Sequence, residues 1–140
     1  STPLYSSAAS DVYKRQWQIP ALQKERSAYY AEHFRRFLNL HSTVVFAASD
    51  FYALDFMRFL QTKGVRIPDD VQIIGFDDTA ASRESVPTLT TVHQDAAQRA
   101  KTALACLEAM RSGRECEAQI VLPVTLIPRE STRKMPCRTL

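Results

Sequence analysis

Short apolar runs and extended segments recur along the chain and predict the strands of a sheet. Residues 44–48 and 71–76 are apolar without alternating polar positions, which is typical of strands buried on both faces of a parallel sheet. Residues 88–94 and 118–130 are also extended in character, and two prolines restrict the last segment to a sheet edge or a strand end. Four strand candidates therefore follow one another along the chain.

Helical periodicity fills the intervals between these strand candidates. Ser27 is placed to cap a first helix with aromatic side chains on one face, and a second helix is expected over residues 50–63, ending at Gly64. Asp95 is placed to cap a third helix that ends at Gly113. Its apolar stripe consists of Ala96, Ala100, Ala103, Leu104, Leu107 and Met110. Strands that alternate with helices predict an α/β fold with a mainly parallel sheet.

The two ends of the chain differ in character from its middle. Residues 1–16 are rich in Ser, Ala and Thr, show neither helical nor strand periodicity, and do not begin with Met. The string SDVYKRQ within them resembles translated adapter sequence, so we expect a non-native or disordered segment, with a natural loop as the alternative. Residues 17–133 are expected to form one partial domain, and residues 134–140 a flexible tail.

Composition places the chain among globular proteins. Apolar residues make up 45% of it and charged residues 24%, and the net charge of +3 is too small to indicate nucleic-acid binding by itself. The three cysteines form no C-x-x-C pair, which is typical of reduced thiols in a cytosolic protein. No apolar run approaches the roughly 18 residues that a membrane helix needs, so no membrane partner is expected.

Candidate catalytic and metal-binding residues are scarce. His33, His41 and His93 stand at no recognisable spacing from any Cys or acid, so no catalytic residue and no metal site is expected. With only three glycines, the sequence also has no P-loop, no G-x-G-x-x-G and no G-x-S-x-G motif. We therefore expect neither an enzyme nor a bound cofactor.

Polar residues directly follow two of the strand candidates. Ser49 and Asp50 come after the first, and Gly75 near the end of the second is followed by Asp77 and Asp78. Ligands of open parallel sheets bind beyond the carboxyl ends of the strands, so these positions are candidates for a ligand site. Because neighbouring strand residues point in opposite directions, the two adjacent acids cannot act as a catalytic dyad. We expect Asp77 to accept hydroxyl hydrogens of a sugar-like ligand, Asp78 to form a turn and Asp50 to cap the second helix.

Three segments resemble one known family in their order and spacing: FAASDFYAL, GVRIPDDVQIIGFDDTAASRESVPTLTTVHQ and VLPVTLIPRESTR. Over residues 27–133 the chain is similar to the C-terminal effector-binding region of the LacI/GalR family of bacterial transcription regulators. The resemblance implies the type I periplasmic-binding-protein fold, in which three crossing strands join two α/β lobes. The chain would then hold mostly the C-terminal lobe, incompletely, and residues 17–133 would be a partial effector-binding domain.

The resemblance also implies the residues of an effector site between the lobes. Ser49 would reach the effector, although it replaces the longer Asn of some members, and Asp77 would bind effector hydroxyls. Gln94 lies near the effector in the sugar-responsive members, and Trp17 either stacks on a sugar face or is a partly buried core residue. Hexoses, pentoses, sugar phosphates and purines all stay open, with Asp77 favouring a neutral polyol because a carboxylate repels phosphate.

Partners follow from the same resemblance. Members of the family bind operator DNA through an N-terminal helix-turn-helix domain, which these 140 residues do not contain. A cytoplasmic homodimer is implied, in which effector binding changes operator affinity. Tyr52, Leu54, Phe56 and Phe59 on the second helix are expected at the dimer interface. The alternative is that this helix lies between the sheet and another helix.

A periplasmic sugar-binding protein of an ABC transporter shares this fold and is the rival interpretation. It would carry a secretory signal peptide and no DNA-binding domain. By the family layout, the third helix crosses into the other lobe, so its apolar stripe would have no partner within this chain. We therefore expect the isolated chain to fold poorly or to associate.

Overall fold

The computed structural model describes residues 16–117 and 119–133. The predicted tail at 134–140, and the predicted non-native segment at 1–16 except for its last residue, lie outside the described residues. The elements follow the order α1 (Gln23–Asn39), β1 (Val44–Phe46), α2 (Asp50–Thr62), β2 (Gln72–Phe76), α3 (Ala80–Glu84), β3 (Thr90–Gln94), α4 (Ala96–Arg111) and β4 (Val124–Ile127).

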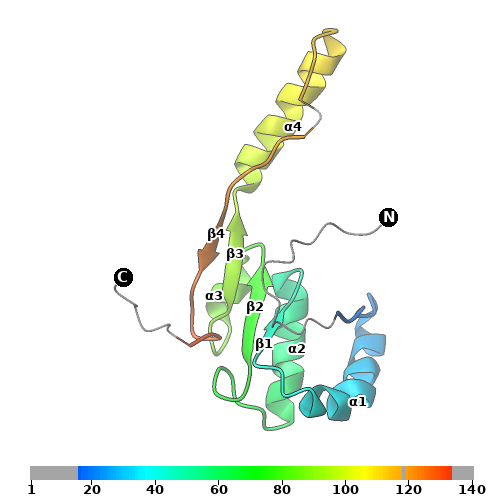
Figure 1. Ribbon diagram of the computed structural model, residues 1–140, viewed down its shortest axis with the longest axis vertical. Coiled ribbons are helices and arrows are strands. Elements are labelled where there is room, and N and C mark those ends of the chain that lie inside the picture. Colours follow the sequence, from blue (N-terminus) through cyan, green and yellow to red (C-terminus); the bar gives the residue numbers. More distant parts are fainter. Residues whose placement is uncertain (1–15, 118, 134–140) are drawn as a thin grey trace.

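The strands form one sheet in the order β1-β2-β3-β4 (Figure 1). β1 pairs with β2, and β2 with β3, in parallel, whereas β4 runs antiparallel to β3 at the sheet edge. The predicted α/β fold with a mainly parallel sheet is therefore confirmed. The edge position of β4 is also as expected, because its flanking prolines cannot donate to a ladder on both sides.

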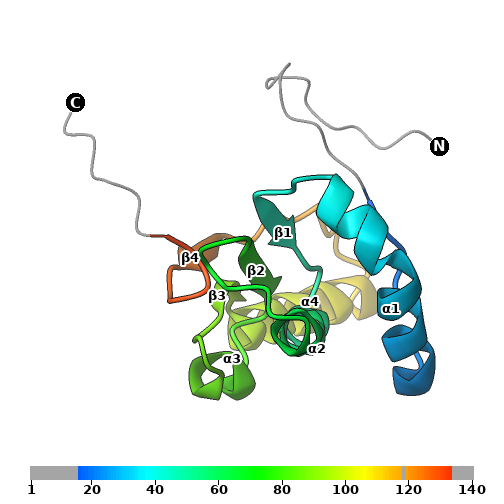
Figure 2. The same cartoon turned by 90° about the horizontal axis from the view of Figure 1, so that it is seen from below.

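The hydrophobic core lies between the sheet and the helices α1 and α2. Figure 2 shows α2 and α3 on one side of the sheet, with α1 beyond α2. Met57 and Leu60 of α2 are almost fully buried, as are Ile73 of β2 and Leu89 just before β3. No helix in the described ranges is long and apolar enough to cross a membrane.

An ion pair with a buried arginine links α1 to α2. The Arg26 side chain is only 3% exposed, and its Nε donates to Asp55 Oδ2 over 2.7 Å. The Tyr30 hydroxyl donates to the same carboxylate oxygen over 3.3 Å. Burial, together with the charge of Asp55, raises the pKa of Tyr30 above its ordinary value. This arginine would be costly to bury without its carboxylate partner, so the pair fixes how the two helices face each other.

Among the described residues, helices cover only one face of the sheet. Val44 and Phe46 of β1 are 48% and 60% exposed, whereas Val45 between them packs against the core. The expectation that this strand is buried on both faces is therefore wrong. The described part of the chain supplies helices for one face, and none of them lies over the other (Figure 2).

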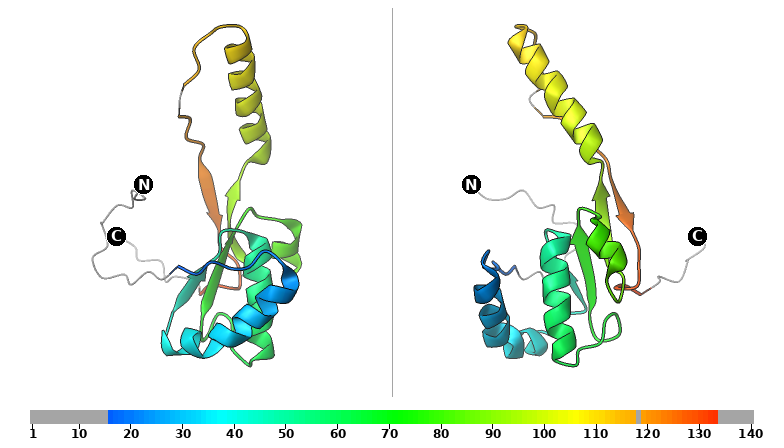
Figure 3. Two further views of the ribbon diagram at one scale, coloured as in Figure 1. Left: turned by 90° about the vertical axis from the view of Figure 1, so that its right-hand side faces the viewer. Right: turned by 180° about the vertical axis from the view of Figure 1, so that it is seen from behind.

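Residues 95–117 and 119–123 extend away from the rest of the molecule, and we call them the arm; residues 16–94 and 124–133 form the body. The arm consists of α4 and the segment that returns alongside it to β4 (Figures 1 and 3). None of the α4 residues is buried, and Leu104, Leu107 and Met110 are 62%, 61% and 67% exposed. The apolar stripe of α4 thus has no partner among the described residues, as expected from the family layout.

The start of α4 agrees with its predicted cap, whereas the start of α1 does not. Asp95 caps α4, as predicted, and its carboxylate accepts a hydrogen bond from the Gln98 backbone N–H over 2.8 Å. The prediction for Ser27 is wrong, because α1 begins four residues earlier at Gln23 and Ser27 lies exposed within it. The short helix α3 was not predicted, since five residues are too few to show periodicity.

Candidate functional site

The backbone turns sharply where β2 ends. Asp77 and Asp78 have φ values of 107° and 51°, which non-glycine residues rarely adopt. Such residues cost roughly 1–3 kcal/mol each and cluster at ligand sites and switch regions. The turn directs the two adjacent carboxylates to different partners, as the sequence predicted.

Asp77 and Gln94 meet at the carboxyl ends of β2 and β3, where the arm begins. Gln94 Nε2 donates to Asp77 Oδ1 over 2.8 Å, and Arg99 Nη1 in turn donates to Gln94 Oε1 over 2.6 Å. Asp77 and Arg99 are exposed and Gln94 is half-buried. The structure therefore brings together two predicted site residues and adds Arg99, which no sequence pattern indicates. We call these three residues the polar relay.

Asp78 has a structural role beside the relay. Its carboxylate accepts hydrogen bonds from Arg83 over 2.8 Å and from Arg129 over 2.5 Å, and it contacts His93 Nδ1 at 3.1 Å. Burial alone would raise the pKa of this carboxyl, but the hydrogen bonds and charges of the two arginines outweigh it and lower the pKa to about 2. Asp78 thus joins α3, β3 and the segment after β4.

Asp50 does not cap α2, which corrects the prediction. The N-cap residue is Ser49, and the fully buried Asp50 carboxylate turns toward the sheet instead. It accepts hydrogen bonds from Thr91 Oγ1 over 2.5 Å and from the Thr79 backbone N–H and hydroxyl over 2.7 and 3.0 Å. These bonds fix the loop after β2, and hence the turn that carries the polar relay.

Gly75 makes room for that carboxylate. A Cβ atom at this position would lie 2.3 Å from Asp50 Oδ1 and 2.9 Å from Leu89 Cδ2. Contacts this short force neighbouring atoms to move, and Asp50 is held by three hydrogen bonds. The glycine near the end of β2 is therefore required by packing.

Two further predicted site residues lie away from the relay contacts. Ser49 is half-buried at the start of α2, and its side chain makes no capping hydrogen bond. Trp17 packs on α1, with ring centroids 6.4, 5.8 and 6.0 Å from those of Tyr29, His33 and Phe37. These contacts match the alternative of a partly buried core tryptophan.

The expected interface residues of α2 are engaged within the chain. Phe56 lies 5.0 Å from Tyr30 and Phe59 lies 5.6 Å from Phe34, both measured between ring centroids, and Leu54 is buried. Tyr52 is half-buried. The structure therefore has the alternative arrangement, in which α2 lies between the sheet and α1. Whether these residues also reach a second subunit stays a prediction.

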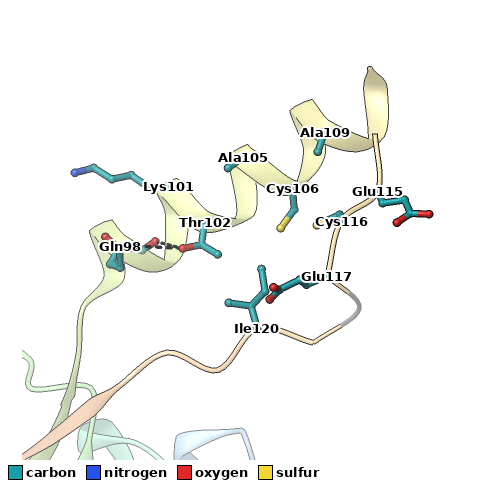
Figure 4. Close-up of a pocket in the computed structure, with 10 residues that line it drawn as sticks. All are labelled: Gln98, Lys101, Thr102, Ala105, Cys106, Ala109, Glu115, Cys116, Glu117 and Ile120. Carbon is teal, nitrogen blue, oxygen red and sulfur yellow. Dashed lines mark hydrogen bonds between the residues drawn. The ribbon is translucent and has the colours of Figure 1, made fainter. Parts of the chain in front are cut away.

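The arm contains an open hollow between α4 and the returning segment, with a volume of about 460 Å³ (Figure 4). Cys106 and Cys116 line it, with their sulfur atoms close to each other. Both are free thiols, and the contact with Cys106 raises the pKa of the Cys116 thiol. A protonated thiol is a poor nucleophile and a poor metal ligand, so this contact makes Cys116 less reactive than an ordinary thiol.

Comparison with protein families identifies the fold around the relay. The model of the periplasmic binding protein-like domain matches residues 6–132. Together with the observed sheet, this match confirms the predicted fold class.

Individual relatives are transcription regulators. The lactose operon repressor of Escherichia coli is 33% identical over 90 residues, which are 64% of this chain and 25% of the repressor. The transcriptional repressor PurR of Mannheimia succiniciproducens is 30% identical over 132 residues, which are 92% of this chain and 39% of PurR. The chain thus spans well under half the length of these relatives.

A solved structure shows the same relationship. It is a periplasmic binding protein/LacI transcriptional regulator from Alkaliphilus metalliredigens, complexed with D-xylulofuranose. The two chains share 34% identity with a TM-score of 0.60, over 66% of this chain and 35% of the other.

Proposed function

Because the chain belongs to the periplasmic binding protein-like domain family, with LacI-type repressors among its relatives, we propose that it is part of the effector-binding domain of a LacI-type transcriptional regulator. The observation that carries the proposal is the Asp77–Gln94 pair. A carboxylate and an amide, 2.8 Å apart, stand at the carboxyl ends of two parallel strands, where open sheets bind ligands.

The pair suits a hydroxylated ligand. Gln94 occupies only Oδ1 of Asp77, so the other carboxylate oxygen can accept a ligand hydroxyl in a charge-assisted hydrogen bond. Ser49, at the end of the neighbouring strand, is proposed as a further contact. The bound D-xylulofuranose of the Alkaliphilus relative supports a sugar-like effector. Stacking of Trp17 on the ligand stays a prediction.

Effector binding would act on DNA through linkage. In this proposal the whole regulator is a cytoplasmic homodimer that binds operator DNA through a separate domain. An effector that prefers one domain geometry shifts operator affinity by the coupling free energy, typically about 1–3 kcal/mol. Tyr52, Leu54, Phe56 and Phe59 are proposed to contribute to the dimer, with the last three also packing within the chain.

A transport protein and an enzyme are less well supported. The curated relatives named above are transcription regulators, which favours a regulator over a periplasmic sugar-binding protein of a transporter. The site offers hydrogen-bond partners for hydroxyls, and Asp78 beside it is engaged by two arginines. We therefore propose ligand binding without catalysis.

Asp77→Ala in the regulator that contains this chain tests the proposal. We expect effector binding, measured by isothermal titration calorimetry, to be lost while operator binding, measured by fluorescence anisotropy, is retained. Asp69→Ala, at an exposed acid before β2, is the matched control and should change neither. An Asp77→Ala variant that keeps its effector response would remove Asp77 from the site.

A further inference from the structure

No stabilising ion pair or packing contact among the described residues explains why position 99 is an arginine. It lies exposed in the first turn of α4, and its Nη1 donates to Gln94 Oε1. No carboxylate in the described ranges lies within ion-pairing distance of it. A cation near the positive end of a helix is mildly unfavourable, and an exposed side chain adds little packing. Helix stability therefore gives no reason for an arginine here.

The relay holds two opposite charges apart. Asp77 and Arg99 would attract each other, but the Gln94 amide lies between them and bonds to one at each end. Neither charge is therefore neutralised by the other through a direct ion pair. Arg99 uses one of its five N–H groups on Gln94, so four stay available to a ligand in this arrangement.

We propose that Arg99 selects an effector that carries a carboxylate as well as hydroxyl groups, such as a sugar acid. The inference rests on the proposed function and names the ligand class of the same site. Asp77 binds a hydroxyl, Arg99 binds the ligand carboxylate through its planar fork, and Gln94 keeps the two protein groups in position.

The relay discriminates between three ligand classes. A neutral sugar satisfies Asp77 but leaves Arg99 without an anionic partner. A phosphate ester can also place its anion at Arg99, but its second negative charge has no cation to pair with in the relay and is repelled by Asp77. A hydroxylated carboxylate places one negative charge at Arg99 and neutral hydroxyls at Asp77, so it matches both ends without excess charge. The preference for a neutral polyol, which followed from Asp77 alone, changes once Arg99 is included.

The test compares acid and neutral partners on the regulator that contains this chain. Calorimetric titrations use D-galacturonate against D-galactose and D-gluconate against D-glucose, with glucose 6-phosphate as the phosphate probe. We expect one acid to bind about tenfold more tightly than its neutral partner, which corresponds to one charge-assisted hydrogen bond. Arg99→Met should weaken that acid by about 10- to 100-fold and leave the neutral sugar within about threefold. Arg99→Lys should restore part of the loss.

The remaining outcomes separate this inference from the proposed function. Arg114→Met, an exposed arginine near the far end of the arm, is the control and should leave every affinity unchanged. Equal binding of acid and neutral partners, unchanged in Arg99→Met, overturns the inference and keeps the regulator. Tighter binding of glucose 6-phosphate than of either acid also overturns it. If none of the probes binds, the inference is overturned, and the proposed function is decided separately by the effector response of Asp77→Ala.

Discussion

The helices α2 and α4 come from the same chain, have similar lengths of 13 and 16 residues, and differ completely in burial. α2 buries five of its residues between the sheet and α1, whereas α4 buries none. Both carry apolar residues at helical spacing. An apolar stripe therefore predicts a helix but not the surface that covers it. The same substitution should therefore destabilise the protein far more in the body than in the arm.

The largest expected effect comes from a matched pair of leucines. Leu60→Ala in α2 should lower the free energy of unfolding by about 2–5 kcal/mol, because it opens a cavity at a side chain that is 0% exposed. Leu104→Ala in α4 should change it by less than about 0.5 kcal/mol, because that leucine is 62% exposed. Urea unfolding of this 140-residue chain, followed by Trp17 fluorescence at dilutions that limit association, measures both.

The leucine pair has a built-in control. Both substitutions exchange the same two residues within a helix, so the difference in helix propensity cancels. Trp17 is the only tryptophan and packs on α1, so its emission reports unfolding of the body. Equal losses in the two variants would contradict the division into a packed body and an uncovered arm.

Asp50→Ala should cause the next largest loss in the free energy of unfolding. Removing the buried carboxylate leaves the Thr91 hydroxyl and the Thr79 backbone N–H without their partner, at a cost of about 2–3 kcal/mol. Asp50→Asn keeps the shape and one accepting oxygen, so it should lose less. The free energy of unfolding is again the measurement, and an unchanged Asp50→Ala variant would show that these hydrogen bonds do not stabilise the body.

Low pH should destabilise the body because it protonates Asp78. The pKa of its carboxyl is 3.8 when unperturbed and about 2 in the folded chain, so the charged form stabilises the fold. This contribution, about 2 kcal/mol, is complete above pH 5 and is lost as the pH falls through 4 toward 2. Asp78→Asn removes it, so the stability difference between wild type and variant should shrink over this window. A constant difference would contradict the assignment.

The smallest effect on the body is expected from Asp95→Ala in the arm. Loss of the cap should destabilise α4 by about 1 kcal/mol locally and leave the unfolding of the body unchanged. Amide hydrogen exchange should accelerate in α4 and stay constant in α2. A parallel loss of protection in α2 would show that the arm and the body unfold together.

Local patterns predicted the elements well, and distant contacts poorly. The boundaries of α2 and the cap at Asp95 follow from residues close in sequence. The partners of Asp50 lie 29 and 41 residues away, so no spacing rule indicates that its carboxylate turns from the helix to the sheet. Arg99 was missed for a related reason, because its contact with Gln94 depends on the direction in which the arm leaves β3.

The family resemblance supplied what periodicity could not. It placed Asp77 and Gln94 in one site, and the structure brings them within 2.8 Å. The assignment of α2 to a dimer interface could not be decided in the same way, because an aromatic helix face suits a second subunit and a neighbouring helix equally well. Here Tyr30 and Phe34 of α1 occupy that face.

Because Gly75 lies so close to Asp50, a redesign of the protein has to change the residues at these two positions together. A side chain at position 75 would occupy the volume that the Asp50 carboxylate now fills. A variant library that randomises either position alone should therefore recover almost only the present residue. Randomising both positions together should recover new pairs, in which a larger residue at 75 accompanies a smaller one at 50. The residues recovered at the two positions would then covary, which reveals a contact that neither position shows alone.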